Sequence, residues 1–163
     1  MKQPNSTRMK YCFPLFFIAF IACNQLTTPE SNMVTPAEEM IAKDLIQGAF
    51  DDLWAGVDST LILNYHTEDF IILENGEVWD NNRIKQFMRK QLAKDNRNRR
   101  VNIMDYISID KYGPSMQIAY HNKAEFYSND SLVGEGSWLE SALAIETNEG
   151  WRLKMMHSTW NKK

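Results

Sequence analysis

Residues 138–160 read WLESALAIETNEGWRLKMMHSTW and decide the fold. Two apolar-rich runs flank residues 147–150, Thr-Asn-Glu-Gly, and Asn and Gly in so short a connection favour a β-hairpin. With Gly150 in the left-handed position of a three-residue loop, Ser141 pairs with His157, whereas a two-residue loop would mix apolar and charged faces. The alternation then predicts one apolar face, interrupted by Ser141 and His157, that forms a pocket floor. Its other members are Leu139, Leu143, Ile145, Leu153 and Met155.

Residues 1–22 have the composition of a signal peptide. Lys2, Arg8 and Lys10 precede an uninterrupted apolar run over residues 11–22, which is too short to span a membrane as a mature helix. The run ends in Phe-Ile-Ala-Cys, which resembles a bacterial lipobox and predicts lipidation of Cys23. A plain secretory signal or an uncleaved anchor is the alternative. Either way we expect the domain to leave the cytoplasm, and the lipobox predicts a cell-envelope lipoprotein anchored through Cys23 and facing the periplasm or the exterior.

The remaining composition limits the classes of function. The two cysteines are Cys12 and Cys23, so the folded part has no thiol nucleophile, disulfide or Cys-ligated metal. Without residues 1–22 the net charge falls from −3 to −6, which argues against nucleic-acid binding. The histidines lack metal-binding spacing, and no phosphate-binding loop or dinucleotide fingerprint is present. We therefore expect no metal and no cofactor.

The order of predicted elements indicates an α+β domain. Residues 23–35 form a tether, and the domain covers residues 36–163. Helices are predicted from Thr35 to about Gly56, after Asp58 or Ser59, and over about residues 82–93. Residues 70–73 and 78–79 form a short hairpin, and alternating segments after Val101 predict a four-stranded antiparallel meander. The charged residues 94–100, KDNRNRR, are interpreted as a solvated connector, with an anion site as the alternative.

Several segments together resemble the SnoaL-like branch of the nuclear-transport-factor-2-like superfamily. They are the amphipathic first helix, the corner Tyr65-His66-x-x-Asp69-Phe70, the strand segment Tyr120-His121-Asn122, and the 138–160 hairpin ending His157-Ser158-Thr159. The resemblance implies a cone, in which a strongly curved, mostly antiparallel sheet wraps three N-terminal helices around an apolar pocket. It also implies, in many members, a dimer through the outer sheet face. Members include polyketide cyclases, ketosteroid isomerase, scytalone dehydratase and non-enzymatic binders, so the fold does not define the activity.

Two residues are candidates for catalysis. In an apolar cavity His157 would be a neutral imidazole able to relay a proton, and Asp69 beside Phe70 would be a carboxylate suited to a general base. The structural alternatives are a core histidine bonded to Ser141 or the backbone, and an aspartate that caps a strand end.

Further residues are candidates for ligand contacts. Each has a polar tip or an aromatic ring expected at the pocket: Ser141, Tyr120, Asn122, Tyr65, His66 and Trp54. Trp138, Glu140 and Trp160 fall on the opposite face of the hairpin, which we interpret as a subunit contact or a covered surface.

Three functions follow from these residues. The first is a lipid-anchored domain that binds a small, largely apolar molecule in the cone. The second is a cofactor-free proton-transfer enzyme (isomerase, cyclase or dehydratase) that uses His157 with Asp69 or Tyr120. The third is a dimeric interaction module whose pocket is filled by side chains.

Overall fold

Helix α1 (Pro36–Ala49) starts at a well-formed N-cap. In the computed structural model, Thr35 and Glu38 form a reciprocal capping box, and Pro36 occupies the first helical position. The structure describes residues 33–161. The predicted signal peptide, Cys23 and most of the tether lie outside the described residues and stay predictions.

The end of the first helix widens into a π-helix, η1 (Phe50–Ala55). The sequence predicts one α-helix ending at Gly56, and Gly56 does follow the last turn. Asn102 holds the widened turn, because its Nδ2 donates to the carbonyl of Phe50 at 3.1 Å and to Oδ1 of Asp51 at 3.2 Å. Extra residues in a turn redirect the side chains that follow it, and Trp54 of η1 lines a cavity.

The other helices form close to their predicted places. Asp58 caps the 3₁₀ turn η2 (Ser59–Leu61), which leads into the short helix α2 (Ile62–Tyr65). Asp80 caps α3 (Asn81–Leu92) by accepting from the backbone N–H of Arg83 at 2.7 Å. Among residues 33–161, none of the helices is long and apolar enough to cross a membrane.

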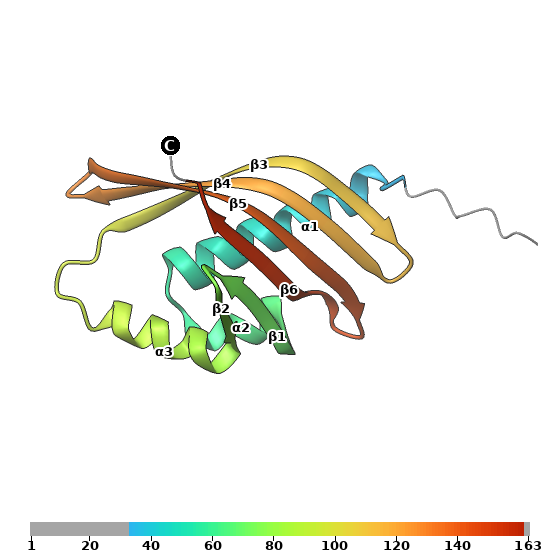
Figure 1. The fold of residues 1–163 in the computed structure, drawn as a ribbon, viewed down its shortest axis with the longest axis horizontal. Coiled ribbons are helices and arrows are strands. Elements are labelled where there is room, and N and C mark those ends of the chain that lie inside the picture. The colour runs from blue at the N-terminus through green and yellow to red at the C-terminus, as the bar shows by residue number, and fades with distance from the viewer. Residues whose placement is uncertain (1–32, 162–163) are drawn as a thin grey trace, which may run out of the picture. The chain divides into compact units, whose positions relative to one another are not determined.

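Six strands form one curled sheet, which confirms the predicted α+β class and the antiparallel meander (Figure 1). They are β1 (His66–Glu74), β2 (Glu77–Asp80), β3 (Arg99–Tyr112), β4 (Ser115–Ser128), β5 (Ser131–Thr147) and β6 (Gly150–Trp160). Their order is β2-β1-β6-β5-β4-β3, and the one parallel pair joins β1 to β6. This pairing brings the small N-terminal hairpin beside the end of the chain.

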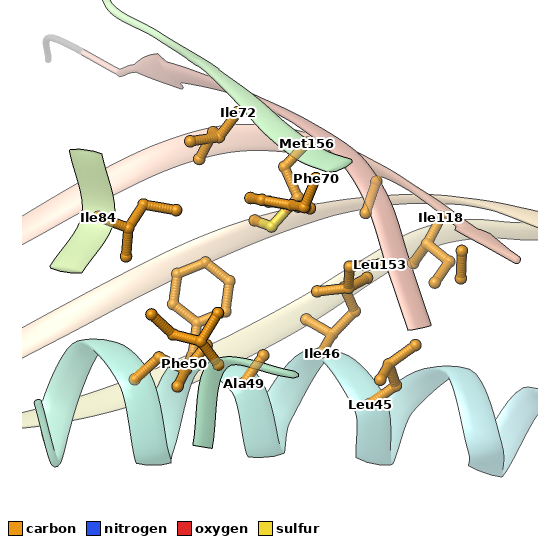
Figure 2. Packing of buried hydrophobic residues seen from close by; sticks show 14 of the residues in the cluster. Leu45, Ile46, Ala49, Phe50, Phe70, Ile72, Ile84, Ile118, Leu153 and Met156 are labelled. Carbon is orange, nitrogen blue, oxygen red and sulfur yellow. The ribbon is translucent and has the colours of Figure 1, made fainter. Parts of the chain in front are cut away.

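The core lies between α1 and the inner face of the sheet (Figure 2). Ile46, Ala49 and Phe50 point from the helix toward Leu153 and Met156 of β6, and all five are buried. Phe70, Ile72, Ile84 and Ile118 complete this part of the cluster. The predicted inner face of β4, including Met116, Ile118 and Tyr120, is confirmed by its complete burial.

The prediction of which hairpin face is buried is wrong. The pairs Trp138–Trp160, Ser141–His157 and Leu143–Met155 form as predicted, but a bulge follows, and the loop has two residues, so Ile145 pairs with Arg152. Leu139 is 48% exposed and His157 is also exposed. The buried face carries Glu140, Ala142, Ala144, Met156 and Ser158.

Side-chain size explains the inversion. The sheet is concave toward α1 and η1, so its inner face has little room and takes alanines opposite Ile46 and Phe50. On β5 the larger Leu139 lies on the convex side, whereas β6 buries Leu153 and Met156 on the inner face. On β3, Ile103 and Ile107 are 45% and 55% exposed and Asp105 also faces out, while Met104 and Tyr106 pack against the core.

Candidate functional site

An aromatic-walled cavity of about 400 Å³ opens beside the core. It lies among η1, α3, the β1–β2 hairpin and the inner face of β5 and β6. Its walls are mostly aromatic, and most of its polar groups are charged: Phe50, Trp54, Ile72, Glu74, Asn75, Glu77, Trp79, Arg83, Phe87, Arg100, Trp138, Glu140 and Ser158.

The carboxyl group of Glu140 is the most deeply buried acid that lines this cavity. Glu140 is 5% exposed; its Oε1 accepts from the Ser158 hydroxyl at 2.9 Å, and its Oε2 accepts from Nδ2 of Asn122 at 3.3 Å. Burial raises the pKa of Glu140 to about 7, against these two hydrogen bonds and the charge of Arg100, which favour the carboxylate. Glu140 can therefore exchange a proton near neutral pH.

Tyr120 lies behind Glu140 and is fully buried. Its hydroxyl lacks a hydrogen-bond partner of good geometry among the described residues, yet it is close enough to Glu140 for each to affect the other's pKa. Burial and the Glu140 charge raise the pKa of Tyr120 well above its usual value. The hydroxyl therefore stays protonated and remains a donor.

Arg100 supplies the positive charge of the cavity. Its Nε donates to Oδ1 of Asn102 at 2.7 Å, and its guanidinium carbon is 5.3 Å from the Trp138 ring centroid and 5.8 Å from that of Phe50. Burial lowers the pKa of Arg100, while Glu140 and Glu74 act to raise it. The guanidinium is thus held by rings and one amide.

Trp138 reaches the cavity because residue 136 is glycine. A β-carbon at Gly136 would lie 2.5 Å from Cη2 of the Trp138 ring, closer than two carbons can approach. The edge of Trp138 also meets Trp160, with ring centroids 4.7 Å apart and planes at 85°. Gly136 and Trp160 therefore set the position of this wall.

The open side of the cavity carries an acid–base rim. Trp79 donates from Nε1 to Glu77 at 2.7 Å, and Arg83 lies 4.9 Å over the Trp79 ring. Glu74 is half-buried, and burial raises its pKa. Charged groups therefore lie both at the opening, at Glu77 and Arg83, and deep in the cavity, at Glu140 and Arg100, while the walls are aromatic.

Three of the candidate residues from the sequence are at or beside this cavity. Trp54 lines it, and Tyr120 and Asn122 lie around Glu140. The other candidates do not line it. His157 and Ser141 face the opposite side of the sheet, and Asp69 is exposed and paired with Lys154.

Tyr65 and His66 have structural partners instead. Tyr65 donates to Oδ2 of Asp52 at 2.5 Å. His66 is buried, stacks on Phe70 with ring centroids 3.7 Å apart, and contacts Oδ1 of Asn81 through Nδ1 at 2.9 Å. Because the Asn81 amide nitrogen donates to backbone carbonyls, its oxygen must accept, so Nδ1 of His66 carries the proton. Burial lowers the pKa of His66 to about 4.

Sequence reasoning placed Glu140 on the wrong face of the hairpin, and it included Arg100 only as part of the alternative anion site at residues 94–100. The available signal was the alternation of Glu140 with Ala142 and Ala144, a small-residue stripe that fits a concave face. Among residues 33–161, no group of three or more His, Cys, Asp or Glu side chains is placed to hold a metal ion.

The raised pKa of Glu140 predicts a pH-dependent stability. Its pKa is 4.5 in the unfolded chain and about 7 in the folded chain, so the folded state holds the proton more tightly. Stability should therefore fall as pH rises from about 4.5 to 7, by about 3 kcal/mol. Glu140→Gln should remove this dependence, as measured by urea unfolding at several pH values.

The control for this experiment is Glu146→Gln, an exposed site on the same strand. His66 acts in the opposite direction, because its lowered pKa costs stability as pH falls from 6.5 to about 4. His66 is present in both proteins, so it cancels in their difference. If the difference in unfolding free energy between Glu140→Gln and Glu146→Gln does not change with pH, the raised pKa of Glu140 is contradicted.

Comparisons with known proteins bear on the fold. No family model matches the chain, and no curated protein matches it in sequence. Solved structures do match. Aln2 from a Streptomyces species aligns with a TM-score of 0.68 at 8% identity, over 78% of this chain and 93% of that one.

Two more solved structures agree. The CamKII hub homology domain of Chlamydomonas reinhardtii has a TM-score of 0.66 at 14% identity, over 76% of this chain and 98% of its own. An NTF2-like protein from Cytophaga hutchinsonii has a TM-score of 0.59 at 9% identity, over 79% and 100%. At these identities the likeness shows the fold alone: the described chain has the α+β cone of NTF2-like proteins.

Proposed function

We propose that the cavity binds a small, largely apolar molecule that makes its polar contact with Glu140. The observation that carries this proposal is a cavity of about 400 Å³ with aromatic walls and one buried, ionisable carboxyl group. This volume lies within the range of small-molecule sites. A pocket filled by side chains, as in the third hypothesis from the sequence, would leave much less space.

Two further considerations support a binding role. The SnoaL-like branch that the sequence resembles includes binders as well as enzymes, and the structure has the cone that the resemblance implies. Anchoring through Cys23 and a location in the cell envelope stay predictions from the sequence.

A fluorescent neutral probe tests the binding. N-phenyl-1-naphthylamine is aromatic and uncharged and brightens in apolar sites, so we expect it to bind to the cavity. Phe87→Ala removes a wall and should weaken binding by about tenfold or more, as expected for the loss of a buried ring. Val78→Ala is the control, because Val78 is 66% exposed and does not line the cavity. Equal affinities for the wild type and both variants would refute binding at this site.

A second function, proton transfer, is favoured by one observation. Glu140 has a pKa near 7 and lies close to the Tyr120 hydroxyl, which has no other partner of good geometry among the described residues. A carboxylate with this pKa can remove a proton from carbon next to a carbonyl, and Tyr120, which does not line the cavity, acts on this base and not on the substrate. This pairing replaces His157 and Asp69 with Glu140 as the base.

Hydrogen–deuterium exchange tests proton transfer without a known substrate. In D₂O the protein should catalyse exchange of the α-protons of 2-tetralone, measured by NMR, with a rate that rises with pH through about 7. Glu140→Gln should abolish the catalysed exchange. Tyr120→Phe should move the midpoint to higher pH, because the Tyr120 hydroxyl helps to lower the pKa of Glu140. Exchange that survives Glu140→Gln would exclude this residue as the base.

We also propose that two copies of the chain meet through the convex sheet face. Large apolar side chains are exposed there on three strands: Ile103 and Ile107 on β3, Leu139 on β5 and Met155 on β6. The fold similarity to the CamKII hub homology domain supports the proposal that this chain associates with a second copy of itself. Trp138 and Glu140, expected at a subunit contact from the sequence, face the cavity instead.

Light scattering after size exclusion tests the dimer. Leu139→Glu should give a monomer, because the substitution buries a charge in the contact. Leu132→Glu is the control, since Leu132 lies on the same strand with a similar exposure of 51%, near the β4–β5 turn. A wild-type protein that is monomeric at high concentration would refute the contact.

A further inference from the structure

A second cavity, of about 340 Å³, adjoins the first near the end of α3. The two share four lining residues, namely Trp54, Phe87, Arg100 and Trp138. The second cavity extends from this common wall to residues 94–98, the charged connector before β3. A molecule packed against the shared aromatic rings therefore lies at the boundary of the two cavities.

The charges of the two cavities differ. The first is lined by the acids Glu74, Glu77 and Glu140 together with two arginines. The second is lined by Lys94, Arg97 and Arg100, and its lining contains no aspartate or glutamate among the described residues. Arg100 also lies near Glu140 and Glu74 of the first cavity, whereas the described residues that line the second cavity include no acid beside Lys94 and Arg97. Positive charge in a partly enclosed space attracts anions.

The guanidinium of Arg100 is placed to bind an anion inside the second cavity. Within the described part of the chain, its Nε bonds to Asn102, and no carboxylate lies within ion-pairing distance of it. Three rings surround the guanidinium, with centroids of Trp138, Phe50 and Phe126 5.3, 5.8 and 5.9 Å from its central carbon. Removing a charge from water without a direct counter-ion is costly, so an anion that reaches the terminal nitrogens is favoured.

Arg97 and Lys94 extend this charge to the opening. Arg97 donates to the carbonyl of Gly56 at 3.4 Å, and Lys94 donates to Oε1 of Gln91 at 2.7 Å. Neither forms an ion pair with the described residues, whereas the neighbouring Arg99 pairs with Asp130. Both side chains are exposed, so they are accessible to an incoming ligand.

We propose that the ligand is an amphipathic anion, whose apolar body lies against Trp54, Phe87 and Trp138 and whose acidic group binds Arg100 and Arg97 in the second cavity. Guanidinium groups bind carboxylates, sulfonates and phosphates through paired hydrogen bonds, which fixes the orientation of the ligand. The inference deepens the proposed binding function and rests on it. It also favours the anion site over the solvated connector as the interpretation of residues 94–100.

Two matched dyes test the proposal. 1-Anilinonaphthalene-8-sulfonate is N-phenyl-1-naphthylamine with one added sulfonate, so the pair isolates the contribution of the anion. We expect the sulfonate to bind about tenfold more tightly, with an affinity that falls as salt is added. Arg97→Gln should remove most of this preference and leave the affinity for the neutral dye unchanged. Arg99→Gln is the control, because Arg99 has the same charge but does not line the second cavity.

Arg100→Gln should reduce the sulfonate affinity further. If Arg100→Gln impairs folding, the comparison of Arg97→Gln with Arg99→Gln still tests the anion site. If both dyes bind equally, or if Arg97→Gln and Arg99→Gln have equal effects, the anion site is refuted while apolar binding stands. Sulfonate binding to the convex face would show the same insensitivity to Arg97 and would also refute it. If neither dye binds, the proposed function fails as well.

Discussion

The close approach of the first helix to a concave sheet is the constraint on which the rest of the structure depends. Ile46, Ala49 and Phe50 are buried against β6 and the alanines of β5. On β5 the inward positions near this contact are held by the small residues Gly136, Ala142 and Ala144, and Leu139 lies outward.

The cavity exists because the helix does not continue to cover the sheet. At η1 the backbone widens, held by Asn102, and the chain turns away toward α2. The side-chain oxygen of Asn102 also accepts a hydrogen bond from Arg100. One amide therefore positions both the turn that carries Trp54 and the guanidinium of Arg100. Backbone geometry and the electrostatics of the site are therefore coupled through a single buried residue.

Buried polar groups concentrate on one side of this space. Glu140, Asn122, Ser158 and Tyr120 lie on three neighbouring strands, and the hydroxyl of Tyr120 and Oδ1 of Asn122 have no partner of good geometry among residues 33–161. Unpaired buried polar atoms cost stability and are rare in cores. The burial that leaves these atoms unpaired also raises the pKa of Glu140.

The sequence by itself determined the elements and their order. Caps at Thr35, Asp58 and Asp80, the change from helical to alternating periodicity, and the pairing of Ser141 with His157 follow from local chemistry, because caps, turns and register depend on neighbouring residues. Trp54, Tyr120 and Asn122 were found in the same way. Tertiary structure alone decided which face of β3 and β5 is buried, since both faces carry apolar residues and local alternation does not distinguish them. That choice moved His157 to the surface and Glu140 into the cavity. It also brought Arg100 beside Trp138, a contact between residues far apart in the chain that no local pattern contains.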